Sequence, residues 1–250
     1  MRKGLIIVAL ALLAWGTGAG TIWADDGVDS DIYKGLLAAY VGSGGEVDYQ
    51  GLKLREAELD AYLDVLRATD PQTLSHNARF AFWINVYNAF TLKLILTDYP
   101  GISSINDIGG FLSSPWKRRF ITIAGQEPLH LDNVEKDILI PEFKDPRVHF
   151  AINCASKSCP PLMPEPFDGL RLEAQLNERA ALFINDGRNV TVRDGELLLS
   201  RIFKWYGDDF GDVAGYVARY ATGALAEDLR SLGAKPRILF LEYDWSLNGT

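Results

Sequence analysis

The strongest hydrophobic pattern in the chain lies between residues 77 and 97, where apolar side chains occur nearly all the way round a helical projection. This pattern is typical of a helix that is buried on most of its sides. Ser75 stands at the position of an N-cap, and Tyr99-Pro100-Gly101 is a helix-ending sequence. The pattern therefore predicts one long buried helix at the centre of the fold.

Two amide side chains interrupt the apolar surface of this predicted helix. Asn85 and Asn88 share a face with Ala81 and Leu92 at helical spacing. An unpaired buried amide costs about 1–3 kcal/mol, so both side chains need partners. Two interpretations are open: the amides bind the backbone of a neighbouring loop, or they line a functional site.

Weaker patterns predict the other elements and the fold class. Asp132 and Glu135 fit a capping box at the start of a short helix that Pro141 ends. We expect a single α+β domain, rich in helices around a small, mostly antiparallel sheet, over residues 25–250. The other predicted helices are 31–40, 52–68, 170–184, 200–206, 213–220 and 225–232. The predicted strands are 120–124, 148–154, a hairpin over 189–199 that turns at Asp194-Gly195, and 237–243.

The first 24 residues have the pattern of a secretory signal peptide. Arg2 and Lys3 precede an apolar run over residues 4–15, which is too short to span a bilayer, and small residues lead to Ala24. We expect cleavage after Ala24, with Gly20 as the second choice and an uncleaved anchor as the alternative. The predicted location is periplasmic or secreted.

Composition and charge narrow the classes of partner. Of the 250 residues, 48% are hydrophobic and 23% are charged, which is typical of a globular chain. Removal of residues 1–24 leaves 23 basic and 33 acidic side chains, a net charge of −10. This acidity argues against nucleic acid or an anionic membrane as partner. No later stretch is apolar enough for membrane insertion after signal cleavage, and the oligomeric state is left open.

The segment 148–161 carries most of the reactive chemistry. It contains Cys154 and Cys159, the only cysteines of the chain, and His149, one of three histidines. The two cysteines are open to three interpretations: a disulfide, which export permits, a nucleophilic Cys154, or a metal site completed by a histidine. We expect no metal and no cofactor. No Gly-rich phosphate loop and no Gly-x-Ser-x-Gly elbow occur in the sequence.

The predicted strand over 148–154 bears on how Cys154 is activated. In a flat strand His149 and Cys154 face opposite sides, so a dyad requires a bend near Asn153. His149 can equally be a hydrogen-bonded core histidine. His76 and His130 are the other candidate bases, and their spacing favours neither.

Several motifs occur together in a fixed order: FWINVYNA (82–89), LDNVE (131–135), PRVHFAINC (146–154) and SCPP (158–161). They resemble the domain-of-unknown-function family 547, and YDWSLN (243–248) resembles that family's bacterial members. The likeness runs from about Gly45 onward. It implies an exported protein and no established activity.

The resemblance also bears on individual residues. Plant-like members keep a cysteine that matches Cys154 and tend to carry serine at Cys159, which implies a role for Cys154 without a disulfide. Many members carry histidine where this chain has Lys136, so His149 would have to serve as the base. The family motifs further imply a site role for Asn85, Tyr87, Asn88, Glu135 and His149.

We therefore predict a thiol-dependent hydrolase or transferase acting on an acyl or peptide-like bond. Cys154 is the expected nucleophile and His149 the expected base. Asn85 or Asn88 is expected to orient the base or to stabilise an oxyanion, and Glu135 to support these side chains without contacting the substrate. The alternative is a non-catalytic binding module in which a Cys154–Cys159 disulfide staples a recognition loop. In either case the ligand is a small molecule or peptide-like group. The expected substrate contacts are Tyr87, Arg147, Ser156 and Cys159.

Overall fold

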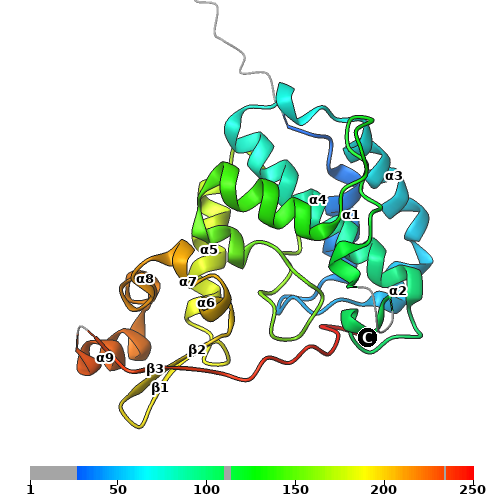
Figure 1. The fold of residues 1–250 in the computed structure, drawn as a ribbon. Coiled ribbons are helices and arrows are strands. Elements are labelled where there is room, and N and C mark those ends of the chain that lie inside the picture. The colour runs from blue at the N-terminus through cyan, green and yellow to red at the C-terminus, as the bar shows by residue number, and fades with distance from the viewer. Residues whose placement is uncertain (1–26, 110–113, 234) are drawn as a thin grey trace, which may run out of the picture.

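The computed structural model describes residues 27–109, 114–233 and 235–250 (Figure 1). The predicted signal peptide lies outside these residues. Helix α4, His76–Asp98, is the central element, and the Ser75 hydroxyl accepts a hydrogen bond from the Ala78 N–H at 3.4 Å, as expected of an N-cap. The long buried helix predicted from the sequence is confirmed.

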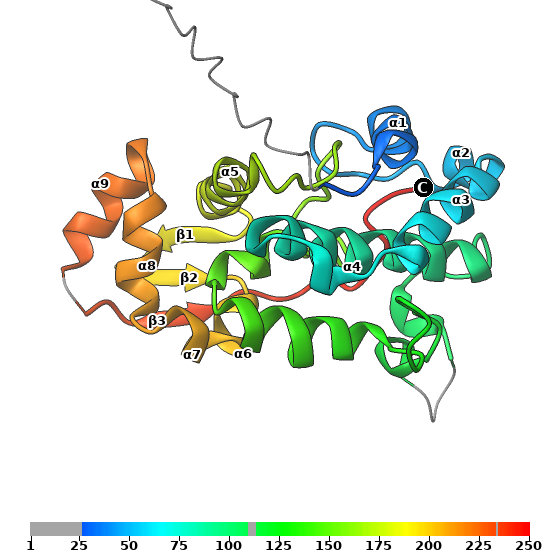
Figure 2. The ribbon, with the colours of Figure 1, turned by 90° about the horizontal axis from the view of Figure 1, so that it is seen from above.

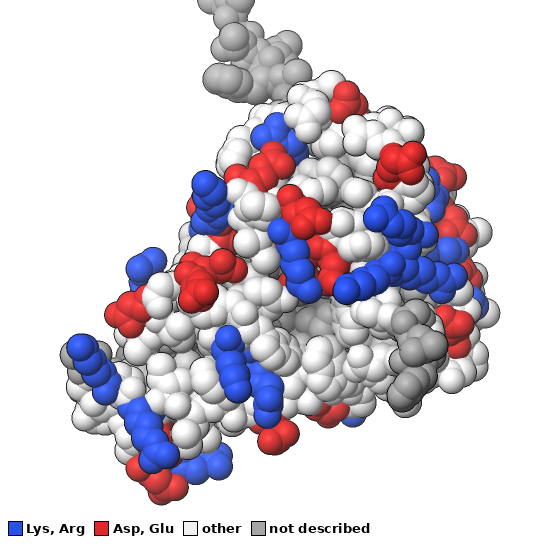
Figure 3. All heavy atoms as spheres, in the orientation of Figure 1, with Lys and Arg blue, Asp and Glu red and all other residues white. Residues whose placement is uncertain are grey.

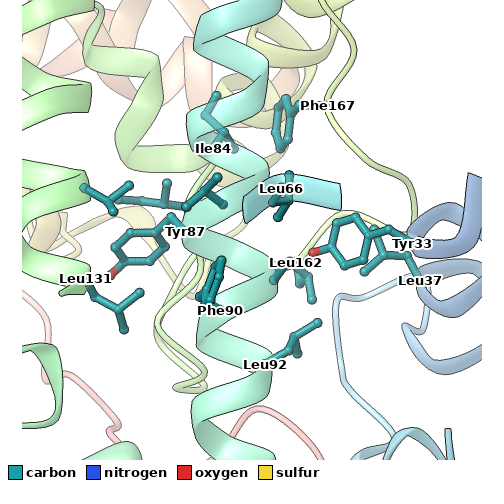
Figure 4. Close-up of a cluster of buried hydrophobic side chains, with 14 of the residues drawn as sticks. Tyr33, Leu37, Leu66, Ile84, Tyr87, Phe90, Leu92, Leu131, Leu162 and Phe167 are labelled. Carbon is teal, nitrogen blue, oxygen red and sulfur yellow. The ribbon is translucent and has the colours of Figure 1, made fainter. Parts of the chain in front are cut away.

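Helix α4 is covered on opposite sides. Figure 4 shows Leu66, Tyr33 and Phe167 on one side of α4, and Tyr87 with Leu131 on the other. It is the one helix of the described residues with the length and composition to cross a membrane, and 89% of its most apolar window is buried inside the molecule. Its apolar surface therefore forms the protein core. The helices that pack on it are α3 (Glu56–Ala68), α5 (Leu172–Ile184) and the wide π-type helix η4 (Asn133–Phe143). Helix α1 (Asp31–Tyr40) packs on α3 and on α2 (Tyr49–Leu54).

The sheet lies at the end of the molecule opposite to α2, beside α8 and α9 (Figures 1 and 2). Strands β1 (Val190–Arg193) and β2 (Glu196–Leu199) form the predicted hairpin, and Asp194 and Gly195 have the positive φ angles, 54° and 76°, of a type I′ turn. Strand β3 (Ile238–Phe240) pairs with β2 in parallel. The α+β class is confirmed, although the three-stranded sheet is mixed rather than mostly antiparallel.

The parallel pairing follows from the connection between β2 and β3. A chain that leaves one end of β2 and returns parallel to it needs a crossover. Here the crossover is helical, and its last helix packs on β1 and β2. Its members are α6 (Ile202–Trp205), α7 (Gly207–Phe210), α8 (Val213–Tyr220) and α9 (Gly223–Leu232).

The strand predicted over 148–154 is wrong. The segment instead forms a 3₁₀ helix, η5 (Pro146–Phe150), whose N-cap Asp145 accepts a hydrogen bond from the Arg147 N–H at 2.9 Å. Pro146 supplies the fixed φ that suits the first position of such a turn. A short apolar run can belong to a buried helix as well as to a strand, and here tertiary packing decides.

Three smaller predictions also differ from the structure. Residues 120–124 form only an isolated bridge, Ile121 with Leu129, and residues 52–68 are divided between α2 and α3 at Arg55. Asp132 does not cap η4 through its side chain. The short 3₁₀ segments are η1 (Pro71–Thr73), η2 (Ile105–Asp107) and η3 (Pro115–Lys117).

Candidate functional site

The chain bends sharply at the reactive loop. The Asn153 Oδ1 accepts a hydrogen bond from the Ala155 N–H at 2.8 Å, and its Nδ2 donates to the Pro160 carbonyl at 2.7 Å. Ala155 takes a left-handed backbone conformation with φ 62°, which is uncommon for a residue with a Cβ. Cys154 therefore sits at the apex of a pinned turn rather than on a flat strand.

The buried amides of α4 hold this turn and the segment beyond it. The Asn88 Nδ2 donates to the Ala151 carbonyl at 3.0 Å, and its Oδ1 accepts from the Asn153 N–H at 2.8 Å. Asn85 makes the same pair of bonds with the backbone of Phe167, at 2.8 and 2.9 Å. Both amides thus bind loop backbone, the first of the two interpretations given above.

The C-terminal segment supports the loop from another side. It runs from β3 across the molecule to the α2 end (red in Figure 1). The Lys157 N–H donates to the Ser246 carbonyl at 2.9 Å, and the Asn248 N–H donates to the Ala155 carbonyl at 3.0 Å. This pairing fixes Tyr243 beside Cys154.

The Cys154 sulfur lies in a group of hydrogen-bonding side chains. It is 3.0 Å from the Ser156 hydroxyl and 3.4 Å from the Tyr243 hydroxyl. The Cys159 sulfur accepts the Cys154 backbone N–H at 2.8 Å. A hydrogen bond from the Cys159 thiol, with smaller ones from Ser156 and Tyr243, outweighs burial and lowers the pKa of Cys154 to about 7. Burial raises the pKa of Cys159, which therefore remains the protonated donor.

Cys154 faces a cavity of about 570 Å³. This volume is in the range of small-molecule binding sites. The wall combines aromatic rings with a few polar groups from η4, the reactive loop, α6 and the C-terminal segment. Its members include Tyr87, Trp116, Asp132, Glu135, Lys136, His149, Ile152, Cys154, Cys159, Trp205, Tyr206, Tyr243 and Trp245.

His149 lies in the wall of the same cavity. Its Nε2 is 2.7 Å from the Asp209 Oδ2, and its ring stacks on Tyr206 with 4.1 Å between ring centres. A carboxylate only accepts, so Nε2 carries the proton and Nδ1 has the free lone pair. Burial lowers the pKa of His149, and Asp209 opposes that shift. The imidazole is therefore neutral at neutral pH and able to accept a proton.

Glu135 is buried at the other side of Tyr206. Its carboxylate accepts a hydrogen bond from the Tyr206 hydroxyl. Burial raises the pKa of Glu135, while hydrogen bonds from Tyr206 and Tyr87 oppose the shift. The capping role predicted for Glu135 is thus replaced by a buried contact across the cavity wall.

The structure brings some of the sequence-predicted site residues together and separates others. Cys154, His149, Glu135, Tyr87 and Cys159 line one cavity. Among the hydrogen bonds of the described residues, none joins His149 to Cys154. The remaining predicted residues do not line this cavity: Asn85 and Asn88 hold backbone, Ser156 contacts the Cys154 sulfur, and Arg147 is bound by Asp145 and Glu173.

Other residues of the site escaped the sequence reasoning. Asp209 and Tyr206 are not among the predicted site residues, and Tyr206 only ends the helix predicted over 200–206. Tyr243 and Trp245 lie in the motif YDWSLN (243–248), and this motif was the one signal available for them in the sequence. No spacing rule links them to Cys154, because the contact spans 89 residues of chain.

Neither a disulfide nor a metal cluster is found in the described part of the chain. Cys154 and Cys159 are both free. No group of three or more His, Cys, Asp or Glu side chains within those residues has the arrangement of a metal site.

Comparison with known proteins gives a family and no function. A family model described as "Protein of unknown function, DUF547" matches residues 71–184. Searches of curated proteins and of solved structures gave no match. The matched region contains α4, η4 and the Cys154 loop. Residues 71–184 therefore match DUF547, a family of proteins of unknown function.

Proposed function

We propose that the protein is a thiol-dependent hydrolase or transferase that acts on an acyl or peptide-like bond, with Cys154 as nucleophile. The observation that carries the proposal is the position of the Cys154 sulfur. Cys154 lines the cavity, and hydrogen bonds to its sulfur lower the pKa of the thiol to about 7. A thiol with a pKa near the ambient pH combines a large thiolate fraction with good nucleophilicity.

His149 and Asp209 supply the proton-transfer groups of the proposed mechanism. The neutral imidazole takes the thiol proton at Nδ1, and Asp209 keeps Nε2 protonated and the ring oriented. The thiolate attacks the acyl carbon, the bond to the leaving group breaks, and the leaving group takes the proton from the imidazolium. Since no hydrogen bond links His149 to Cys154, the proton passes through substrate or a water in the cavity.

A covalent-trapping experiment tests this proposal. Incubation with activated aryl esters and thioesters is expected to leave one acyl group on Cys154, located by peptide mass spectrometry. Cys154→Ala removes the adduct, and Cys159→Ser, the matched control that keeps a donor to the Cys154 sulfur, retains it. Alkylation of Cys154 by iodoacetamide without any acyl adduct from a panel of esters would refute the mechanism.

The alternative, a binding module stapled by a Cys154–Cys159 disulfide, makes a different prediction for the unreduced protein. The proposed enzyme has two titratable thiols per chain, as in the structure, where both cysteines are free. Thiol titration of protein purified without reductant that finds no free thiol in active material would favour the staple.

Export is part of the proposal and is supported by the signal-like sequence of residues 1–24. N-terminal sequencing of protein from a bacterial periplasmic extract should find a chain that begins at Asp25, or near Gly20. A chain that still begins at Met1 would contradict cleavage.

A further inference from the structure

Glu135 is a buried carboxylate without a cationic partner. The residue is 5% exposed, and it lines the cavity that Cys154 faces. Its hydrogen-bond partners are tyrosine hydroxyls, and no ion pair of the described residues includes it. The adjacent Lys136 forms its ion pair with Asp132 at 2.8 Å and acts on Glu135 only through its charge, without an ion pair. A buried carboxylate in this situation is stabilised by any cation that enters the cavity.

Aromatic rings form another part of the same cavity wall. Tyr243 and Trp245 lie 4.5 Å apart between ring centres, Trp205 and Tyr243 4.8 Å, and Trp116 and Trp245 5.7 Å. The interplanar angles of these pairs are 50°, 57° and 72°, so tilted and edge-to-face contacts link the four rings into one aromatic platform. The face of a tryptophan or tyrosine ring attracts an ammonium group, most strongly when the group is desolvated.

We propose that this cavity selects substrates that carry a positively charged amino or quaternary ammonium group, with Glu135 as counter-ion and the platform of Trp116, Trp205, Tyr243 and Trp245 as its apolar wall. As a statement about substrate, the inference rests on the proposed role of Cys154. It assigns to Glu135 a binding role in place of a catalytic one.

The charged side chains outside the cavity do not provide the same selection for positively charged substrates. Figure 3 shows a hollow on the face drawn, bordered by both acidic and basic side chains. Lys136 and Asp132 neutralise each other in the cavity wall. Exposed charges are screened within about 8 Å at physiological salt, whereas a buried carboxylate is screened much less. Charge selection inside the cavity is therefore set by Glu135.

Thiol-directed probes of different charge test the inference without knowledge of the substrate. The probes are three methanethiosulfonate esters: one with a trimethylammonium group, its uncharged tert-butyl analogue, and one with a sulfonate. In each reaction the Cys154 thiolate attacks the sulfenyl sulfur, a new S–S bond forms, and methanesulfinate leaves with the electron pair of the broken S–S bond. The measurement is made in a Cys159→Ser background, so that no second thiol displaces the product.

The expected result is an order of rates. At physiological ionic strength the cationic probe should react about tenfold faster than the uncharged one, because one desolvated charge pair is worth about 1.4 kcal/mol or more. The sulfonate probe should be the slowest. In Glu135→Gln the ratio of cationic to uncharged rates should fall to about one to threefold. Asp137→Asn, which removes an exposed carboxylate from the same helix outside the cavity wall, should keep the ratio of the parent.

Each outcome of these measurements supports or overturns the inference. A cationic probe no faster than the uncharged one, a faster sulfonate probe, or an unchanged ratio in Glu135→Gln would overturn the inference. If Glu135→Gln does not fold, as judged by circular dichroism, the order of the three probes on the parent still decides. Charge selection with no acyl adduct at Cys154 would refute the proposed enzyme and leave a cation-binding cavity. An acyl adduct at Cys154 with no preference for the cationic probe would support the proposed enzyme and refute selection for cationic substrates.

Discussion

The reactivity of Cys154 depends on donors that are close to it in space and have different positions in the chain. Cys159 and Ser156 come from the same loop, whereas Tyr243 comes from the C-terminal segment. Each donor stabilises the thiolate more than the thiol, and together they outweigh burial, which acts in the opposite direction. Loss of any one donor should raise the pKa.

Cys159→Ala removes the largest of these contributions. The pKa of Cys154, about 7 in the parent, should rise by about one to two units, because a hydrogen bond to a charged group is worth about 1.5–3 kcal/mol. The pH dependence of the iodoacetamide rate measures it: the rate increases with pH as the thiolate forms, and the midpoint should move to higher pH. Cys159→Ser keeps a donor and should move the midpoint less. Equal midpoints in the parent and the Ala variant would show that Cys159 has no such effect.

Asp209 acts on Cys154 only through His149. Asp209→Asn removes the carboxylate that fixes the ring and its tautomer, so the rate of acyl transfer to Cys154 should fall by about 10- to 100-fold. Asp208→Asn, an exposed neighbour on the same short helix, is the matched control and should change the rate less than twofold. The iodoacetamide rate of the Asp209→Asn thiolate should stay close to that of the parent. A fall in that rate as well would indicate a structural role for Asp209.

At the level of elements, α4 and the reactive loop form one unit. The apolar residues on all sides of the helical projection, together with the N-cap Ser75, predicted both ends of α4 to within about one residue. These signals are local, because they lie within the helix and at its N-cap. The loop could not be predicted in this way. Its bend depends on the Asn88 amide, 65 residues away, and on the pairing of residues 155 and 157 with the C-terminal segment. The run of apolar residues before Cys154 is a pattern that a buried strand would also have, so the sequence alone did not distinguish it from the 3₁₀ helix η5.

Asn88→Ala tests this unit. The substitution leaves the Ala151 carbonyl and the Asn153 N–H without their partner, and it should lower the free energy of unfolding by about 2–4 kcal/mol. Urea denaturation followed by circular dichroism measures the change. Gln126→Ala, at an exposed turn, should stay within about 0.5 kcal/mol of the parent. A stability loss below about 1 kcal/mol would indicate that the loop does not depend on α4.

Across the whole molecule, the site joins two apolar clusters. One surrounds α4, and the other contains Phe150, Phe183, Phe203 and Phe210 beside the sheet. The class and the β1–β2 hairpin were predictable because turn chemistry and periodicity are local. The parallel partner of β2 and the contacts of His149 with Asp209 and Tyr206 were not, because each depends on the path of the helical crossover. The sequence thus indicated Cys154 and His149, which line one cavity, but it did not indicate the residues that complete the candidate site.

The region that matches the family model, residues 71–184, should not fold alone. It lacks α1 and α3, so the α4 surface that packs on Tyr33, Leu37 and Leu66 would be exposed to water. Exposure of large apolar side chains costs about 1.5–3 kcal/mol each, which exceeds the margin of a typical domain after a few residues. Thermal and urea unfolding should therefore be cooperative for residues 27–250 and absent for residues 71–184. A cooperative transition in the shorter fragment would contradict this expectation, because it would show that α4 and the Cys154 loop are stable without α1, α3 and the C-terminal segment.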